Sequence, residues 1–140
     1  MKELRIAASL ENLEEVQEFI RRELDGYHVP KRTMSQIDVC VEEIFVNIAN
    51  YAYEPERGEA VIGCEVTQQN VLELMIRFSD WGKPFNPLEK EDTDVTLSAE
   101  ERQIGGLGIF MVKKIMERVE YQYEDNRNIL TMWKYIVETG

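Results

Sequence analysis

The chain has 140 residues, a formal net charge of -11 and a hydrophobic fraction of 44%. This length is enough to bury one hydrophobic core, so we expect a single domain over residues 1–140. The negative charge repels phosphate backbones and anionic lipid headgroups, and the sequence contains no local basic patch to offset it. These properties argue against direct binding to nucleic acid or to a membrane surface.

The sequence shows no sign of a membrane span or of a structural metal site. Three of the first five residues are charged, and no apolar stretch approaches the roughly 18 residues that a membrane helix needs, so we expect a cytoplasmic protein. Cys40 and Cys64 lack the paired spacing of a zinc or redox motif, and His28 is the only histidine. We therefore expect both cysteines to be small core residues.

The first half of the chain predicts one strand and two helices. Apolar residues alternate over residues 4–8, which is typical of a strand, and Ser9 can cap a helix over residues 10–24. A break containing Gly and Pro at residues 25–30 comes before a second, longer helix over residues 33–53.

The second half predicts two hairpins separated by a helix. Apolar residues occupy alternate positions over residues 60–66 and 72–78, which indicates the first hairpin. Residues 86–103 are polar, mostly acidic and aperiodic, which favours a functional lid, and a helix follows over residues 107–118. Residues 119–137 read as the second hairpin, joined through Asn126-Arg127-Asn128. Helices interleaved with hairpins favour an α/β two-layer sandwich, a mixed β-sheet with its helices packed on one face.

A polar stripe runs along the second predicted helix. Glu43, Asn47 and Asn50 are four and then three residues apart, so they share one face of a helix that is otherwise largely apolar. A carboxylate and two amides on such a helix are costly unless they are paired or face a ligand. The pattern alone fits a ligand site, a solvated face or an internal hydrogen-bond network equally well.

Two glycine-containing segments add further candidates. Asp80 continues the alternation of residues 72–78, so its carboxylate is predicted to lie on the helix-covered face and to need a donor, such as the amino group of adenine. Gly82 would let the backbone approach the base, although Asp80-Trp81-Gly82 also fits a simple turn. Gly105-Gly106-Leu107-Gly108 stands before a helix, where backbone N–H groups can bind phosphate, and it equally fits an ordinary helix start.

Taken together and in this order, the three segments resemble the Bergerat ATP-binding fold, the superfamily of gyrase, histidine kinase and heat-shock chaperone ATPase domains. The segments are Glu43-Ile44-Phe45-Val46-Asn47, Asp80-Trp81-Gly82-Lys83-Pro84-Phe85 and Gly105-Gly106-Leu107-Gly108. Within that superfamily, the Pro84-Phe85 ending and the short chain look like the anti-sigma-factor serine kinases. The resemblance covers nearly the whole chain and implies a histidine-kinase-like ATPase fold.

The resemblance also implies roles for individual residues. Asn47 would bind Mg²⁺, Asp80 would bind adenine, and Glu43 would be the catalytic base that accepts a proton from the attacking hydroxyl. The remaining residues assigned to ATP binding are Asn50, Tyr51, Gly82, Pro84, Gly105, Gly106, Leu107, Gly108 and Thr131. Tyr51 stands where related sequences often have a histidine, and Pro84 replaces the second glycine of the histidine-kinase adenine box. Arg102 and Lys83 border the lid and are weaker candidates for phosphate contacts.

Three functions are compatible with these features. The first is an ATP-dependent serine/threonine kinase that phosphorylates an anti-sigma-factor antagonist and binds a sigma factor. The second is a detached histidine-kinase catalytic domain, and the third is a non-catalytic protein-binding module gated by ATP. A homodimer through an uncovered sheet face or through the first helix is compatible with each of them.

Overall fold

The computed structural model describes residues 1–53, 56–89 and 107–139. Its strands and helices in chain order are β1 (Lys2–Ala7), α1 (Leu13–Glu23), α2 (Lys31–Asn47), β2 (Glu59–Gln68), β3 (Leu72–Asp80), α4 (Leu107–Ile115), β4 (Arg118–Glu124) and β5 (Arg127–Ile136). Three short helical segments accompany them, the 3-10 turns η1 (Leu10–Asn12) and η3 (Pro87–Glu89) and the π-helical turn η2 (Ile48–Ala52).

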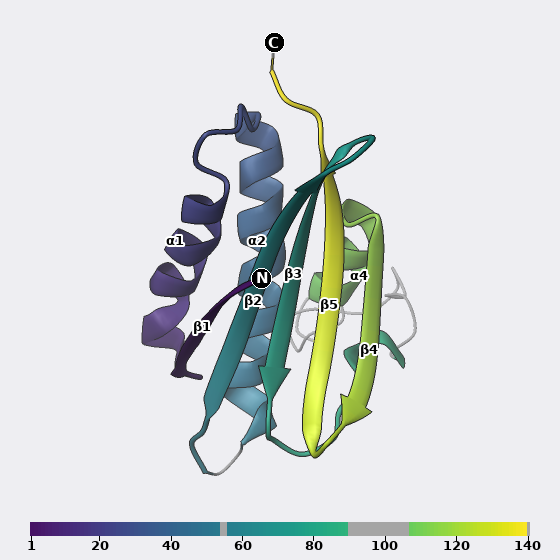
Figure 1. Ribbon diagram of the computed structural model, residues 1–140. Helices are drawn as coiled ribbons and strands as arrows, with labels where there is room; N and C mark the ends of the chain where they lie inside the picture. Colours follow the sequence, from purple (N-terminus) through teal and green to yellow (C-terminus); the bar gives the residue numbers. More distant parts are fainter. Residues whose placement is uncertain (54–55, 90–106, 140) are drawn as a thin grey trace.

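The five strands form one sheet in the order β1-β2-β3-β5-β4, and α1, α2 and α4 lie together on one face of it (Figure 1). The predicted two-layer sandwich is therefore confirmed. The sequence also predicted a mixed sheet, with both parallel and antiparallel neighbours. In the structure, each of the four strand pairs of the described chain is antiparallel. The helix pair α1 and α2 returns the chain to the end of the sheet at which β1 finished, so β2 runs antiparallel to β1. The strands β3 and β4 run in the same direction but are separated by β5.

The core lies between the sheet and the helices and follows the predicted periodicities. Alternate residues of β2, β3 and β5 point toward the helices, and one face of each of the helices α1 and α2 packs against them. The largest fully buried side chains include Ile20, Ile37, Val41, Phe45, Ile62, Leu74, Ile76, Phe78, Val112 and Met132. Cys40 and Cys64 are free and buried as predicted, and burial raises the pKa of each thiol to about 12.

The helix boundaries differ in detail from the predicted ones. The segment that follows Ser9 is a 3-10 turn, and the Ser9 side chain makes no capping hydrogen bond. The helix α2 ends at Asn47, and the chain continues to Ala52 in a wider π-helical turn. Such turns are rare and often lie at functional sites.

The second hairpin has a tighter turn than the sequence suggested. Asp125 and Asn126 have φ values of 55° and 62°, the left-handed pair that joins two antiparallel strands in a two-residue turn. Asn128 is therefore part of β5 and pairs with Asp80 of β3, instead of lying in the connection.

Two further predictions concern the lid and membrane spans. Residues 90 to 103 of the predicted lid lie outside the described residues. Among the described helices, none is both long and apolar enough to cross a membrane.

Candidate functional site

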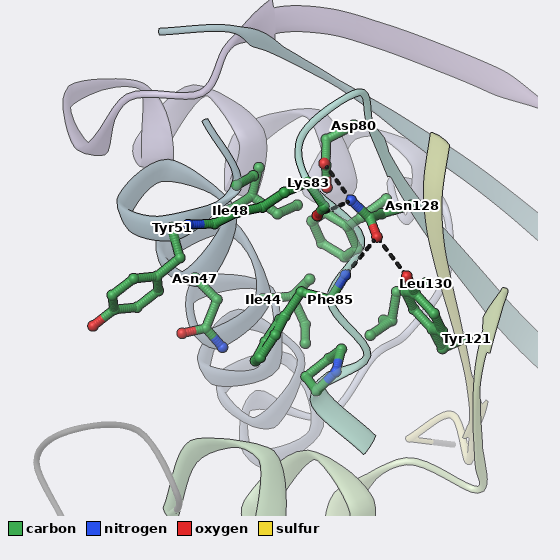
Figure 2. Close-up of a pocket in the computed structure, with 13 residues that line it drawn as sticks. Ile44, Asn47, Ile48, Tyr51, Asp80, Lys83, Phe85, Tyr121, Asn128 and Leu130 are labelled. Atoms are coloured by element: carbon green, nitrogen blue, oxygen red, sulfur yellow. Dashed lines mark hydrogen bonds between the residues drawn. The ribbon is translucent and has the colours of Figure 1, made fainter. Parts of the chain in front are cut away.

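A pocket of about 360 Å³ lies where the last turn of α2 and the π-helical turn pass over the sheet. This volume falls within the usual range for small-molecule sites. The lining residues come from α2, the π-helical turn, strands β3, β4 and β5, and the segment after β3. They are Ile44, Asn47, Ile48, Tyr51, Ala52, Phe78, Asp80, Lys83, Phe85, Pro87, Tyr121, Asn128 and Leu130 (Figure 2). Most of the lining is apolar, so the few polar groups fix the orientation of a ligand.

Asp80 is the buried carboxylate of this pocket, with 5% of the residue exposed. Its Oδ1 accepts hydrogen bonds from the backbone N–H of Gly82 and from the side-chain Nδ2 of Asn128, both at 2.9 Å. Its Oδ2 has no hydrogen-bond donor among the described residues. Burial raises the pKa of Asp80, and the two hydrogen bonds oppose that rise. The free oxygen is thus an acceptor suited to a ligand N–H group.

Glu43 lies at the contact between α2 and α4, outside the lining of the pocket. A Cβ atom on Gly108 would come within 1.7 Å of the Glu43 Oε2 atom, so the carboxylate occupies the space that a side chain at Gly108 would need. Burial and, less strongly, the neighbouring Glu42 carboxylate raise the pKa of Glu43. A carboxylate with a raised pKa is a stronger base when ionised.

Asn47 and Tyr51, which the sequence assigned to Mg²⁺ and ATP, line the pocket, and Figure 2 shows Asn47 on the opposite side of it from Asp80. The Asn47 amide has no hydrogen-bond partner among the described residues, so its oxygen is available to a cation. Mg²⁺ prefers oxygen ligands and is usually held by one or two protein groups together with substrate phosphates and water. The described residues contain no cluster of three or more His, Cys, Asp or Glu side chains that could hold a metal. A single amide oxygen fits a Mg²⁺ ion that binds together with the phosphates.

Several residues assigned to ATP from the sequence do not line the pocket. Thr131 is buried on the opposite face of the sheet, where its Oγ1 accepts a hydrogen bond from Arg77 Nε at 3.2 Å. Its assignment was wrong because residues 128, 130 and 132 are the ones that face the helices, and successive side chains of a strand alternate. Asn50 and Pro84 are exposed and absent from the lining, since the π-helical turn and the 81–85 segment direct them outward.

The predicted glycines have mixed outcomes. Gly105 and Gly106 lie outside the described residues, and Leu107 begins α4. Gly82 does not line the pocket; it packs against the π-helical turn, because a Cβ there would lie 2.2 Å from the Ala52 carbonyl oxygen. The next residue, Lys83, donates its backbone N–H to the same carbonyl at 3.0 Å. Position 82 therefore requires glycine because the backbone of the π-helical turn lies too close for a side chain there.

Replacing Gly82 by Ala tests this packing. We expect Gly82→Ala to lower the free energy of unfolding by about 1–3 kcal/mol, because the added methyl group must displace a backbone carbonyl. Chemical denaturation measures the loss. Gly63→Ala is the matched control, since the nearest atom there is the flexible sulfur of Met1 at 2.8 Å. Equal stability of the two variants would contradict the close approach at Gly82.

The sequence missed four polar or aromatic residues of the pocket or gave them little weight. Asn128, Tyr121 and Phe85 line it, and so does Lys83, which was a weak candidate. Tyr121 and Asn128 are joined by a short hydrogen bond from the tyrosine hydroxyl to Oδ1 of the amide. The strand alternation could have placed Tyr121 on the same face as Val119 and Tyr123, but no sequence signal pairs it with Asn128.

The profile of the histidine kinase-like ATPase domain matches residues 6–134. The chain belongs to this family. The match extends from β1 to β5 and includes each described residue of the pocket, so the pocket is part of the family domain.

Individual relatives and structures agree with this assignment. The serine-protein kinase RsbW of Listeria monocytogenes serovar 1/2a is 29% identical over 110 residues, which are 75% of this chain and 68% of that protein. The serine/threonine-protein kinase BtrW of Bordetella bronchiseptica is 26% identical over 97 residues, 69% of this chain and 66% of that protein.

Solved histidine kinase structures share the fold. The mycobacterial sensor histidine kinase MprB has a TM-score of 0.54 at 16% identity, with 99% of this chain and 100% of that chain covered. The histidine kinase domain of the Erythrobacter litoralis EL346 blue-light activated histidine kinase also has a TM-score of 0.54, at 14% identity, and this chain spans 60% of its length.

Proposed function

We propose that the chain is an ATP-dependent serine/threonine protein kinase that acts as an anti-sigma factor and phosphorylates an anti-sigma-factor antagonist. The observation that carries the ATP site is Asp80, a buried carboxylate with one oxygen free of protein donors at one end of an apolar pocket. The kinases RsbW and BtrW among its relatives support the choice of protein substrate.

In this proposal the adenine ring occupies the apolar pocket. Its exocyclic amino group donates to Asp80 Oδ2, and Ile44, Ile48 and Leu130 contact the ring faces. Asn47, on the opposite side of the pocket, would hold Mg²⁺ through its amide oxygen. When bound there, the ion would neutralise charge on the transferring phosphoryl group. The residues at the start of α4 are assigned to the phosphates, because a helix N-terminus presents free N–H groups.

Glu43 is the proposed catalytic base. It precedes Asn47 by one helical turn and its carboxylate lies against Gly108, at the start of α4. Its raised pKa suits a group that accepts a proton from a serine hydroxyl during attack on the γ-phosphate. A binding module without catalysis would not need a carboxylate at this position.

The partners are also part of this proposal. The acidic composition, with a net charge of -11, suits competition for a basic, DNA-binding partner such as a sigma factor in the cytoplasm. Homodimerisation through the face of the sheet opposite the helices, or through α1, is the proposed oligomeric arrangement.

Incubation with γ-labelled ATP, Mg²⁺ and purified candidate antagonist proteins tests the proposed function. We expect label on a serine or threonine of one antagonist, at a rate that depends on ATP. Acid-labile label on His28 of the chain itself would favour the histidine-kinase alternative. ATP binding without transfer to any candidate would favour a nucleotide-gated binding module.

A further inference from the structure

Asn128 is the most highly connected side chain of the pocket. It lies on β5 directly opposite Asp80, and 7% of the residue is exposed. Its Nδ2 donates to Asp80 Oδ1 at 2.9 Å, to the carbonyl of Lys83 at 3.0 Å and more weakly to that of Gly82 at 3.4 Å. Its Oδ1 accepts from the backbone N–H of Phe85 at 3.1 Å and from the Tyr121 hydroxyl. All four hydrogen-bonding positions of the amide are thus used.

These contacts allow only one orientation of the amide. In the reversed orientation the Asn128 oxygen would face the Asp80 carboxylate and two backbone carbonyls. The nitrogen would then face the N–H of Phe85, so donors would face donors and acceptors would face acceptors. The amide is therefore a fixed part of the pocket.

This fixed amide restricts Asp80. Both protein donors to the carboxylate, Gly82 N–H and Asn128 Nδ2, bind the same oxygen, Oδ1. Two donors on one oxygen hold the plane of the carboxylate and leave Oδ2 for the ligand. Without the Asn128 donor, only the bond to Gly82, two residues away, would orient the group.

The same amide also holds the wall of the pocket. It binds three backbone groups of the segment after β3, at Gly82, Lys83 and Phe85. Figure 2 shows the bonds to Lys83 and Phe85 converging on the Asn128 side chain. Lys83 and Phe85 line the pocket. One residue thus sets the acceptor and the adjoining wall together.

We propose that Asn128 is a positioning residue that gives the pocket its selectivity for a 6-amino purine, acting through Asp80 Oδ2 and not through its own contact with the nucleotide. This inference rests on the proposed assignment of Asp80 to the amino group of adenine. It adds a second residue, on another strand, to that assignment. Replacing Asn128 should abolish the selectivity even though residue 80 is still an aspartate.

The test compares two nucleotides that differ only in the amino group, ATP and purine riboside triphosphate, by calorimetry. The wild-type protein should bind ATP about 5- to 150-fold more tightly, the equivalent of one hydrogen bond. Asn128→Ala should lose most of this ratio, because ATP loses the oriented acceptor for its amino group, whereas the loosened wall weakens the binding of both nucleotides alike. Thr131→Ala, on the opposite face of the same strand, is the matched control and should keep the ratio.

Two results would overturn the inference, and they have different meanings. An unchanged ratio in Asn128→Ala, or an equal loss of affinity for both nucleotides, would reduce Asn128 to a structural residue while leaving the ATP site intact. Equal binding of the two nucleotides by the wild-type protein would instead refute the adenine assignment of Asp80, and the inference with it.

A second measurement avoids dependence on the folding of the variant. In the wild-type protein, ATP should shift the NMR signals of the Asn128 side-chain amide protons, because the new bond to Asp80 Oδ2 changes the carboxylate that those protons contact. Purine riboside triphosphate should shift them much less. Equal shifts with the two nucleotides would contradict the inference.

Discussion

Phosphoryl transfer by the Glu43→Gln variant should fall by roughly 10²–10⁴-fold, the usual contribution of a positioned general base. Gln keeps the size of the side chain next to Gly108 but cannot accept the proton of the attacking hydroxyl. Because burial raises the pKa of Glu43, its ionised form destabilises the fold at neutral pH. The neutral amide should therefore leave the stability equal or higher, and ATP affinity nearly unchanged.

Glu42→Gln provides the matched control for this experiment. Glu42 precedes Glu43 on the same helix but is exposed, so its substitution removes the same charge without touching the contact between α2 and α4. We expect the Glu42 variant to transfer phosphate at close to the wild-type rate. A wild-type rate in Glu43→Gln would show that Glu43 is not the base.

The second large effect concerns ATP affinity. Asp80→Asn should weaken ATP binding by about 1–3 kcal/mol, or about 5- to 150-fold in Kd. The amide oxygen can still accept from Gly82 and Asn128, so the internal bonds are retained. The nitrogen then takes the place of Oδ2, and a donor faces the amino group of adenine. The loss should thus appear in binding and not in the melting temperature.

Calorimetric titration with Mg-ATP measures this loss. Asp38→Asn is the control, because Asp38 is a half-buried carboxylate of α2 that pairs with Arg21 at 3.0 Å and does not line the pocket. It should bind ATP like the wild-type protein. If Asp80→Asn bound ATP as tightly as the Asp38 variant, the assignment of adenine to Asp80 would be wrong.

The sequence was sufficient where a local pattern determined the geometry. Asp80 could be placed because the alternation of β3 extends from Leu72 to it without interruption, and Asn47 because helical spacing puts it on the face that meets the sheet. Both residues line the pocket between α2 and the sheet.

Sequence reasoning failed where the geometry depended on strand register. Asn128 was placed in the turn because residues 126–128 are all polar, whereas the left-handed pair Asp125 and Asn126 makes the turn and puts Asn128 opposite Asp80. The orientation of β5 was also undetermined, so the assignment of Thr131 to ATP did not account for its place on the face of the sheet away from the helices. A two-residue turn at Asp-Asn was the available signal, since these residues tolerate positive φ.

Packing between helices was also inaccessible from the sequence. The glycine at position 108 was interpreted as part of a phosphate-binding segment or of an ordinary helix start, but in the structure it also makes room for the Glu43 carboxylate. Glu43 and Gly108 are 65 positions apart in the sequence, so no local pattern predicts that they are in contact.

The most direct test of the central claim, that ATP occupies the pocket between α2 and the sheet, is an NMR titration of the wild-type protein with Mg-ATP. The account predicts that the largest shifts of described residues occur at the backbone amides of Gly82 and Phe85 and at the side-chain amides of Asn47 and Asn128. Shifts concentrated instead around Thr131 and Trp133, on the face of the sheet away from the helices, would contradict it.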